Sequence, residues 1–168
     1  MWDESIAALN RYLADERDTG LWYGHVDMHS GERRATQFGA LDAFLPAVLA
    51  LGGDIPRADR LMDSVFAMWT AHGIEPEQID YVSMDALNPA YHLRPEALES
   101  AYTLYRLTGE RKYVEMGRRM FDAIVEHCRT EKGYAELVSV RTKEKADRME
   151  SFFLAETLKY AYLLFASP

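Results

Sequence analysis

The chain has a single cysteine and no long hydrophobic run, and each absence excludes a class of protein. Because Cys128 stands alone among 168 residues, we expect neither an intrachain disulfide nor a cysteine metal cluster. No apolar run approaches the ~20 residues of a membrane span. The first residues, MWDESIAALNRYL, lack the basic and then apolar regions of a secretory signal, and no Asn-x-Ser/Thr sequon occurs. We therefore expect a soluble chain without a membrane span.

Positive charge is also scarce. The sequence has 19 lysines and arginines against 27 aspartates and glutamates, which gives a formal net charge of −8. Phosphate binding requires clustered cations, so this balance predicts no nucleic-acid partner. With 48% hydrophobic residues, the 168-residue chain is about one domain in size and can bury a core.

Helical periodicity dominates what is present. Apolar residues recur at helical spacing over most of the chain and predict helices near 3–17, 40–51, 56–72, 96–107, 111–128 and 150–165. The intervening stretch at 21–37 loses this spacing and contains the turn signal Ser30-Gly31, so a short β-hairpin is expected there. No central sheet is expected, and no strand within 96–165.

Two helices joined at a glycine recur along the chain. Gly53 and Asp54 match Gly109 and Glu110 at an offset of 56 residues, and a third copy begins near residue 150. This repeat predicts stacked helical hairpins, in an open solenoid or a closed toroid. The third copy lacks its second helix, so we expect an incomplete chain whose uncovered C-terminal helix favours self-association.

The helix expected after Leu93 begins with a cluster of charge. Pro95 suits the first helical position, and Glu96 and Glu99 are three residues apart, so they share one helical face. Arg94 precedes them directly. The connector before this helix is longer than the roughly 12–15 residues after which connectors are usually functional or disordered, and Glu77 lies near its beginning.

A second group belongs to the third copy, where Phe152 and Glu156 are four residues apart. Because the inner helices of a toroid run parallel, their starts are expected to meet at one rim. A ring, an arginine and several carboxylates together are typical of a sugar site. A structural interpretation stays open, since the helix dipole favours Glu96 and Glu99, Arg94 could neutralise them, and Phe152 could be core.

Two long motifs carry a family resemblance. LRPEALES at 93–100 and MESFFLAETLKYAYLLF at 149–165 closely resemble the C-terminal half of glycoside hydrolase family 47. This family contains the class I α-1,2-mannosidases and the ER degradation-enhancing mannosidase-like proteins. The resemblance implies that residues 1–168 are the C-terminal part of a single catalytic domain. The implied fold is all-α, a partial (α/α)₇ barrel (toroid) of helical hairpins with one short β-hairpin, truncated at both ends.

The resemblance also implies a reaction and its residues. The activity implied is calcium-dependent, inverting hydrolysis of terminal α-1,2-linked mannose on oligosaccharides or N-glycans. Glu96 falls on the proposed general base that activates the attacking water. The residues implied to bind the terminal mannose are Glu77, Arg94, Glu99, Phe152 and Glu156. No residue of this chain is implied as a direct Ca²⁺ ligand, and Glu96 and Glu156 would reach the ion only through calcium-bound water.

Departures from the family pattern leave alternatives open. The family's general acid and its calcium-ligating threonine fall outside these 168 residues, so the isolated chain is expected to be inactive. Ala40 stands where the mannosidases proper have histidine, as in mannosidase-like members. The alternatives are a non-catalytic glycan- or protein-binding helical-repeat module and another α/α-toroid sugar enzyme. The compartment is left open: ER or secretory pathway in a eukaryote, cytoplasm or periplasm in a bacterium.

Overall fold

The computed structural model describes residues 1–166, and the expected domain's last two residues, 167–168, lie outside this range. Helices account for about half of the chain. They are α1 (Trp2–Tyr12), the 3₁₀-helix η1 (Ala40–Phe44), α2 (Leu45–Leu51), α3 (Ile55–Ala71), α4 (Glu96–Thr108), α5 (Arg111–Cys128), the π-helix η2 (Phe153–Thr157) and α6 (Leu158–Phe165). None of the helices in this range is long and apolar enough to cross a membrane.

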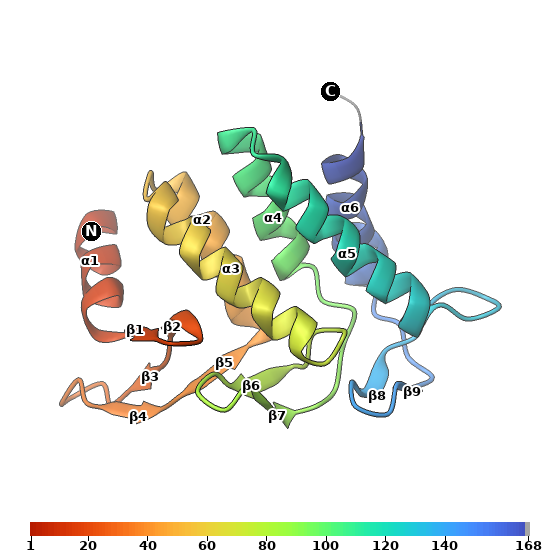
Figure 1. The fold of residues 1–168 in the computed structure, drawn as a ribbon, viewed down its shortest axis with the longest axis horizontal. Helices are drawn as coiled ribbons and strands as arrows, with labels where there is room; N and C mark the ends of the chain where they lie inside the picture. The colour runs from red at the N-terminus through yellow and green to blue at the C-terminus, as the bar shows by residue number, and fades with distance from the viewer. Residues whose placement is uncertain (167–168) are drawn as a thin grey trace.

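The helices pack as two hairpins and one further helix. α2 and α3 form one antiparallel pair, α4 and α5 form the next, and α6 lies against α4 and runs in the same direction (Figure 1). Each pair turns at a glycine in the left-handed region, Gly53 with φ 92° and Gly109 with φ 73°. Glycine adopts this conformation without the steric cost that a Cβ brings. The repeat predicted from the sequence is therefore confirmed for these two hairpins.

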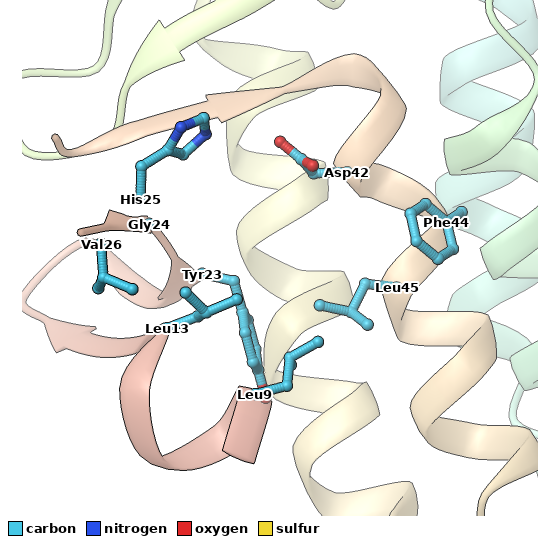
Figure 2. Close-up of a pocket in the computed structure, with 9 residues that line it drawn as sticks. All are labelled: Leu9, Leu13, Tyr23, Gly24, His25, Val26, Asp42, Phe44 and Leu45. Carbon is cyan, nitrogen blue, oxygen red and sulfur yellow. The ribbon is translucent and has the colours of Figure 1, made fainter. Parts of the chain in front are cut away.

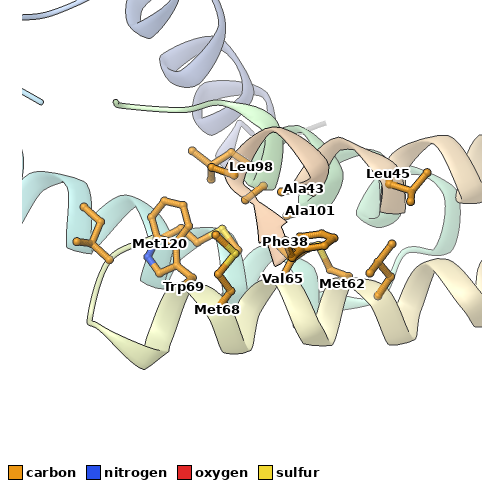
Figure 3. Close-up of a cluster of buried hydrophobic side chains, with 14 of the residues drawn as sticks. Phe38, Ala43, Leu45, Met62, Val65, Met68, Trp69, Leu98, Ala101 and Met120 are labelled. Atoms are coloured by element: carbon orange, nitrogen blue, oxygen red, sulfur yellow. The ribbon is translucent and has the colours of Figure 1, made fainter. Parts of the chain in front are cut away.

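The core fills the space between the hairpins. Leu98 and Ala101 of α4, Met68 and Trp69 of α3, and Met120 of α5 are all buried and gather in one cluster (Figure 3). Interiors of this kind are close-packed, so each helix position depends on its neighbours. The packing thereby determines where α4 begins.

A buried serine joins α4 to η1 and α2. The Ser100 hydroxyl donates to the carbonyl of Ala43 at 2.6 Å and accepts from the amide of Ala47 at 3.3 Å. Both partners are backbone groups at the join of η1 and α2. Ser100 is fully buried, so water cannot replace these bonds at no cost.

Short strands form four small antiparallel sheets, most of them at the lower end of the helices in Figure 1. Their pairings are β1 with β2, β3 with β4, β5 with β6 and β7, and β8 with β9. The bounds are β1 Ala14–Arg17, β2 Gly20–Tyr23, β3 His25–Val26, β4 Arg33–Ala35, β5 Gln37–Gly39, β6 Gln78–Asp80, β7 Asp85–Asn88, β8 Leu137–Ser139 and β9 Glu144–Lys145. The expectation of an all-α chain with a single β-hairpin was therefore wrong in its strand content.

Two of the errors have an identifiable physical cause. The first helix was expected to reach residue 17 but ends at Tyr12, because Ala14–Arg17 pairs with β2, whose Leu21 and Trp22 are buried. The expectation of no strand within 96–165 was also wrong. There Leu137 is fully buried, and its amide and carbonyl both bond to the backbone of Tyr91. β1 and β8 are each paired with a neighbouring strand, and Leu137 has a further backbone partner, Tyr91, that is distant in sequence. Cross-strand pairing and burial therefore outweighed the helical periodicity in these segments.

The other helices lie close to their predicted ranges. α3, α4 and α5 begin and end within one residue of prediction. The segment expected to be helical at 40–51 starts as a 3₁₀-helix, and the one expected at 150–165 contains a π-helical stretch at Phe153–Thr157. π-helical turns are rare and occur often at functional sites.

Replacing the serine that joins α4 to η1 and α2 tests this packing. We expect Ser100→Ala to lower the free energy of unfolding by about 1–3 kcal/mol, because the carbonyl of Ala43 loses its donor in a dry interior. Urea unfolding measures the change. Ser5→Ala is the matched control, since the Ser5 hydroxyl bonds a carbonyl at an exposed site, and its effect should stay within about 0.5 kcal/mol. Equal effects of the two substitutions would show that the buried Ser100 bonds do not stabilise this packing more than an exposed bond does.

Candidate active site

An arginine clamped by a carboxylate lies at the centre of the predicted site. Arg94 donates from Nε to Oε1 of Glu77 at 3.1 Å and from Nη2 to Oε2 at 3.0 Å. Two parallel charge-assisted bonds hold the planar guanidinium in one orientation. The side chains are only 22% and 11% exposed, so solvent screens the pair weakly. Hydrogen bonds from Arg94 to Glu77 raise the pKa of the guanidinium above its ordinary value.

The sheet beneath holds the carboxylate side of this clamp. The carbonyl of Glu77 accepts from the amide of Ala40 at 3.0 Å, and its amide donates to Ala90 at 2.7 Å. Glu77 directly precedes β6, the central strand of the three-stranded sheet. The carboxylate is therefore positioned by backbone bonds on both sides.

A strained residue positions the arginine. Leu93 is fully buried and has φ 58°, a left-handed conformation that is uncommon for a bulky side chain. Its carbonyl accepts a 2.7 Å bond from the hydroxyl of Thr157, itself buried at the end of η2. This bond ties the loop before α4 to the segment that carries Phe152. The guanidinium carbon of Arg94 lies 5.7 Å from the centre of the Phe152 ring, within cation–π range.

The two acids at the start of α4 have different surroundings. Glu96 is half-buried, and its Oε2 is buried without a hydrogen-bond partner among the described residues. Burial raises the pKa of Glu96, although its own backbone amide and Arg94 oppose that rise. Glu99 accepts a 2.5 Å bond from the hydroxyl of Tyr160 on α6. Burial and this bond raise the pKa of Tyr160, so the phenol stays a donor.

Four of the six predicted residues lie at the starts of two helical segments: Arg94 lies just before α4, Glu96 and Glu99 are in its first turn, and Phe152 directly precedes η2. Direct contacts join Glu77 to Arg94 and Arg94 to Phe152, and Tyr160 joins α6 to Glu99. Glu156, on η2, is exposed, and its charge also raises the pKa of Tyr160. The roles assigned to these residues, and their common cleft, stay predictions.

Sequence reasoning missed two features of the same loop region. Glu75 is two residues before Glu77 and is fully buried, with both carboxyl oxygens lacking a hydrogen-bond partner among residues 1–166. His92 Nδ1 lies 2.5 Å from Oε2 of Glu136, a carboxylate that is also buried. The only sequence signal for Glu75 was the second acid in GIEPEQI, and no local pattern indicated that its side chain is buried. The His92–Glu136 contact spans 44 residues, beyond any local pattern.

A pocket of about 340 Å³ lies elsewhere, between α1, the β2–β3 corner and η1 (Figure 2). Its lining is mostly apolar and includes Leu9, Leu13, Tyr23 and Leu45, and none of the six predicted residues contributes to it. The Asp42 carboxylate at its edge accepts a 2.8 Å bond from the amide of Gly39. This pocket therefore carries no argument for the predicted site.

The residues described do not supply a metal centre of their own. Over residues 1–166, no three or more His, Cys, Asp and Glu side chains group so as to hold a metal ion. Two of the predicted carboxylates are already engaged, Glu77 with Arg94 and Glu99 with Tyr160. What the arrangement offers is an oriented guanidinium, an aromatic ring and a half-buried carboxylate.

Comparison with known proteins gives consistent matches. The model of glycosyl hydrolase family 47 matches residues 1–168. The chain is 39% identical over 146 residues to ER degradation-enhancing alpha-mannosidase-like protein 2 of Homo sapiens, covering 86% of this chain and 25% of that protein. It is 36% identical over 146 residues to alpha-mannosidase I MNS4 of Arabidopsis thaliana, covering 86% and 23%. It thus spans about a quarter of the length of these two relatives.

A solved structure agrees with these sequence matches. The fold superposes on the alpha-1,2-mannosidase from Trichoderma reesei with a TM-score of 0.87 and 28% sequence identity. The superposition covers 99% of this chain and 41% of that one. The arrangement of helices and small sheets described above is therefore shared over nearly the whole chain.

The clamp between Arg94 and Glu77 can be measured by a double-mutant cycle. We expect Arg94→Met and Glu77→Gln to show a coupling of about 1–3 kcal/mol in urea unfolding, because both groups are largely buried and bonded twice. The control cycle uses Arg60 and Glu16, an ion pair whose side chains are both more than half exposed, and should give less than about 1 kcal/mol. If the two cycles gave the same coupling energy, the clamp would be contradicted.

Proposed function

The chain belongs to glycosyl hydrolase family 47, and on that premise we propose that it carries part of the catalytic domain of an inverting α-1,2-mannosidase. The substrate would be terminal α-1,2-linked mannose on an oligosaccharide or N-glycan. The domain would be an α/α barrel, to which residues 1–168 contribute two helical hairpins and α6. The observation that carries this proposal is the guanidinium of Arg94, held between Glu77 and the Phe152 ring beside Glu96.

Each side chain has a role that its chemistry permits. Glu96 is the general base that takes a proton from the attacking water, and its raised pKa brings it nearer to a useful working pH. Phe152 packs on the apolar face of the sugar ring. Arg94 donates to sugar hydroxyls while Glu77 keeps it oriented. Inversion requires a general acid roughly 6.5–9.5 Å from the base, and we assign that acid to none of the residues described.

Calcium dependence is proposed for the whole enzyme and not for this chain alone. The described residues do not fit a calcium shell, because Glu77 and Glu99 already have partners and no side chains group around an ion. Hard cations such as Ca²⁺ take six to eight oxygen ligands. In the proposed enzyme the direct ligand lies outside these residues, and no step of the chemistry above is assigned to the ion.

A binding module is the second candidate function. The family resemblance places a histidine of the mannosidases proper at position 40, where this chain has a fully buried alanine, as in mannosidase-like members. One relative is itself named as mannosidase-like. A helical-repeat surface that binds mannose without hydrolysing it would have the same Arg94 and Phe152 contacts, so turnover separates the two functions.

Turnover and binding should separate in the isolated 168-residue chain. We expect no measurable release of mannose from α-1,2-mannobiose with or without calcium. General acid–base groups contribute typically 10²–10⁴-fold each, and in this proposal none of the described residues is the general acid. We expect weak binding of the disaccharide, seen as NMR shifts at Arg94 and lost in Phe152→Ala. Tyr162→Ala, which removes an exposed ring on α6, is the matched control and should leave the binding unchanged.

Three outcomes distinguish the parts of this proposal. Calcium-dependent release of mannose that is lost in Glu96→Gln would support the mannosidase and refute the inactivity of the isolated chain. Equal shifts with an α-1,2-linked glucose disaccharide would refute mannose recognition. Binding that survives Phe152→Ala would place the sugar elsewhere on the molecule.

Self-association is proposed through the exposed side of η2 and α6. Leu154, Tyr162 and Leu163 are 57%, 72% and 37% exposed there. Contiguous exposed apolar side chains commonly mark contact surfaces. We expect a second copy of the chain to bind this face, so that the sedimentation coefficient rises with protein concentration and the rise is lost in Tyr162→Asp. An unchanged coefficient in the wild-type chain would refute it.

A further inference from the structure

Glu75 is a buried acid for which the roles above give no account. It lies in the loop between α3 and β6, and its neighbours Ile74 and Pro76 are buried as well. Its side chain is 0% exposed, and neither carboxyl oxygen has a hydrogen-bond partner among residues 1–166. An ionised carboxylate in such surroundings is costly unless a cation or several donors compensate it.

The groups that could stabilise an ionised Glu75 are bonded to other partners or are absent among the described residues. The nearby cation, Arg94, gives two hydrogen bonds to Glu77 at 3.1 and 3.0 Å. No group of metal-binding side chains surrounds Glu75 in the part of the chain that is described. The buried hydroxyl of Tyr91 also lacks a hydrogen-bond partner among the described residues, so it gives no bond to Glu75. What remains for Glu75 is to keep a proton.

Counting the charges of this interior leads to the same result. Three carboxyl groups, those of Glu75, Glu77 and Glu96, share one guanidinium, which Glu77 occupies. Burial raises the pKa of Glu75 well above its ordinary value, the charges of Glu96 and Glu77 raise it further, and Arg94 opposes them. Glu96 is less deeply buried and has its own backbone amide and Arg94 to favour its ionised form. Glu75 is therefore the group that stays protonated when Glu96 ionises.

We propose that Glu75 is a positioning residue of this site, a neutral carboxylic acid whose retained proton leaves Glu96 as the ionised carboxylate beside Arg94. This rests on the proposed role of Glu96 as general base, because a base must be ionised before it can accept a proton from water. Two ionised carboxylates in one buried space would repel each other, and Glu96 would then hold its proton to higher pH. Glu75 acts through Glu96 and does not itself need to touch substrate.

The experiment is a pH titration of the 168-residue chain labelled with ¹³C at the glutamate carboxyl carbons. We expect one carboxyl signal to remain in the protonated position at pH 7 and to be absent from Glu75→Gln. In Glu96→Gln the midpoint of that signal should fall, because the neighbouring negative charge is gone. Glu115→Gln, at an exposed position on α5, is the matched control and should leave that midpoint in place.

The titration midpoint of Glu96 reports whether Glu75 carries a charge. Gln is a neutral isostere of the protonated acid, so Glu75→Gln should leave the midpoint of Glu96 unchanged. If Glu75 were ionised, the same substitution would lower it by removing a negative neighbour. Stability gives a third readout. The folded pKa of Glu75 is raised, so its contribution is present at low pH and is lost as the pH rises through that pKa; Glu75→Gln should abolish this loss.

A wild-type chain in which every glutamate carboxyl is ionised at pH 7 would overturn the proposal. So would an unchanged midpoint of the protonated signal in Glu96→Gln. The wild-type titration and Glu96→Gln decide the question even if Glu75→Gln does not fold. Because none of these readouts depends on turnover or sugar binding, failure of the proposed mannosidase function would leave the proton on Glu75 detectable, and the two failures can be told apart.

Discussion

The double hydrogen bond between Arg94 and Glu77 is the constraint around which the candidate site is organised. Glu77 is fixed by the three-stranded sheet through its own backbone, and Arg94 follows the strained Leu93. The pair therefore connects the sheet at the rim to the start of α4. Two hydrogen bonds hold the guanidinium in one plane, and the Phe152 ring lies within cation–π range of it. Three segments far apart in sequence meet at one cation.

The helical hairpins could be predicted from the sequence because their signals are local. Gly53 and Gly109 recur at a fixed offset, and both take the left-handed conformation that ends a helix. Ala14–Arg17 and Leu137–Ser139 carried no such signal. Each forms a strand by pairing with a neighbouring strand, β2 in one case and β9 in the other, and Leu137 also bonds to the distant Tyr91. Cross-strand pairing outweighed the helical periodicity at those two places.

The candidate site shows the same division between what is local and what is not. The residue types of LRPEALES and MESFFLAET identify a family and its sugar chemistry, and the comparisons agree with that identification. They do not reveal that Leu93 is strained, or that Thr157 bonds its carbonyl at 2.7 Å across 64 residues. Strain of this kind persists only where surrounding contacts over-determine the backbone. The contact partners had to be seen in three dimensions.

Glu75 and Glu77 show that burial and contact partners, more than residue type, determine the charge state of an acid. They are the same amino acid two positions apart, yet Glu77 meets the guanidinium and Glu75 meets no partner among the described residues. With one cation and three acids in this interior, neutrality at the second acid is the cheapest way to keep the third one ionised. The charge state of Glu96 therefore depends on the whole cluster of charges around Arg94, and in our proposal the buried Glu75 belongs to that cluster.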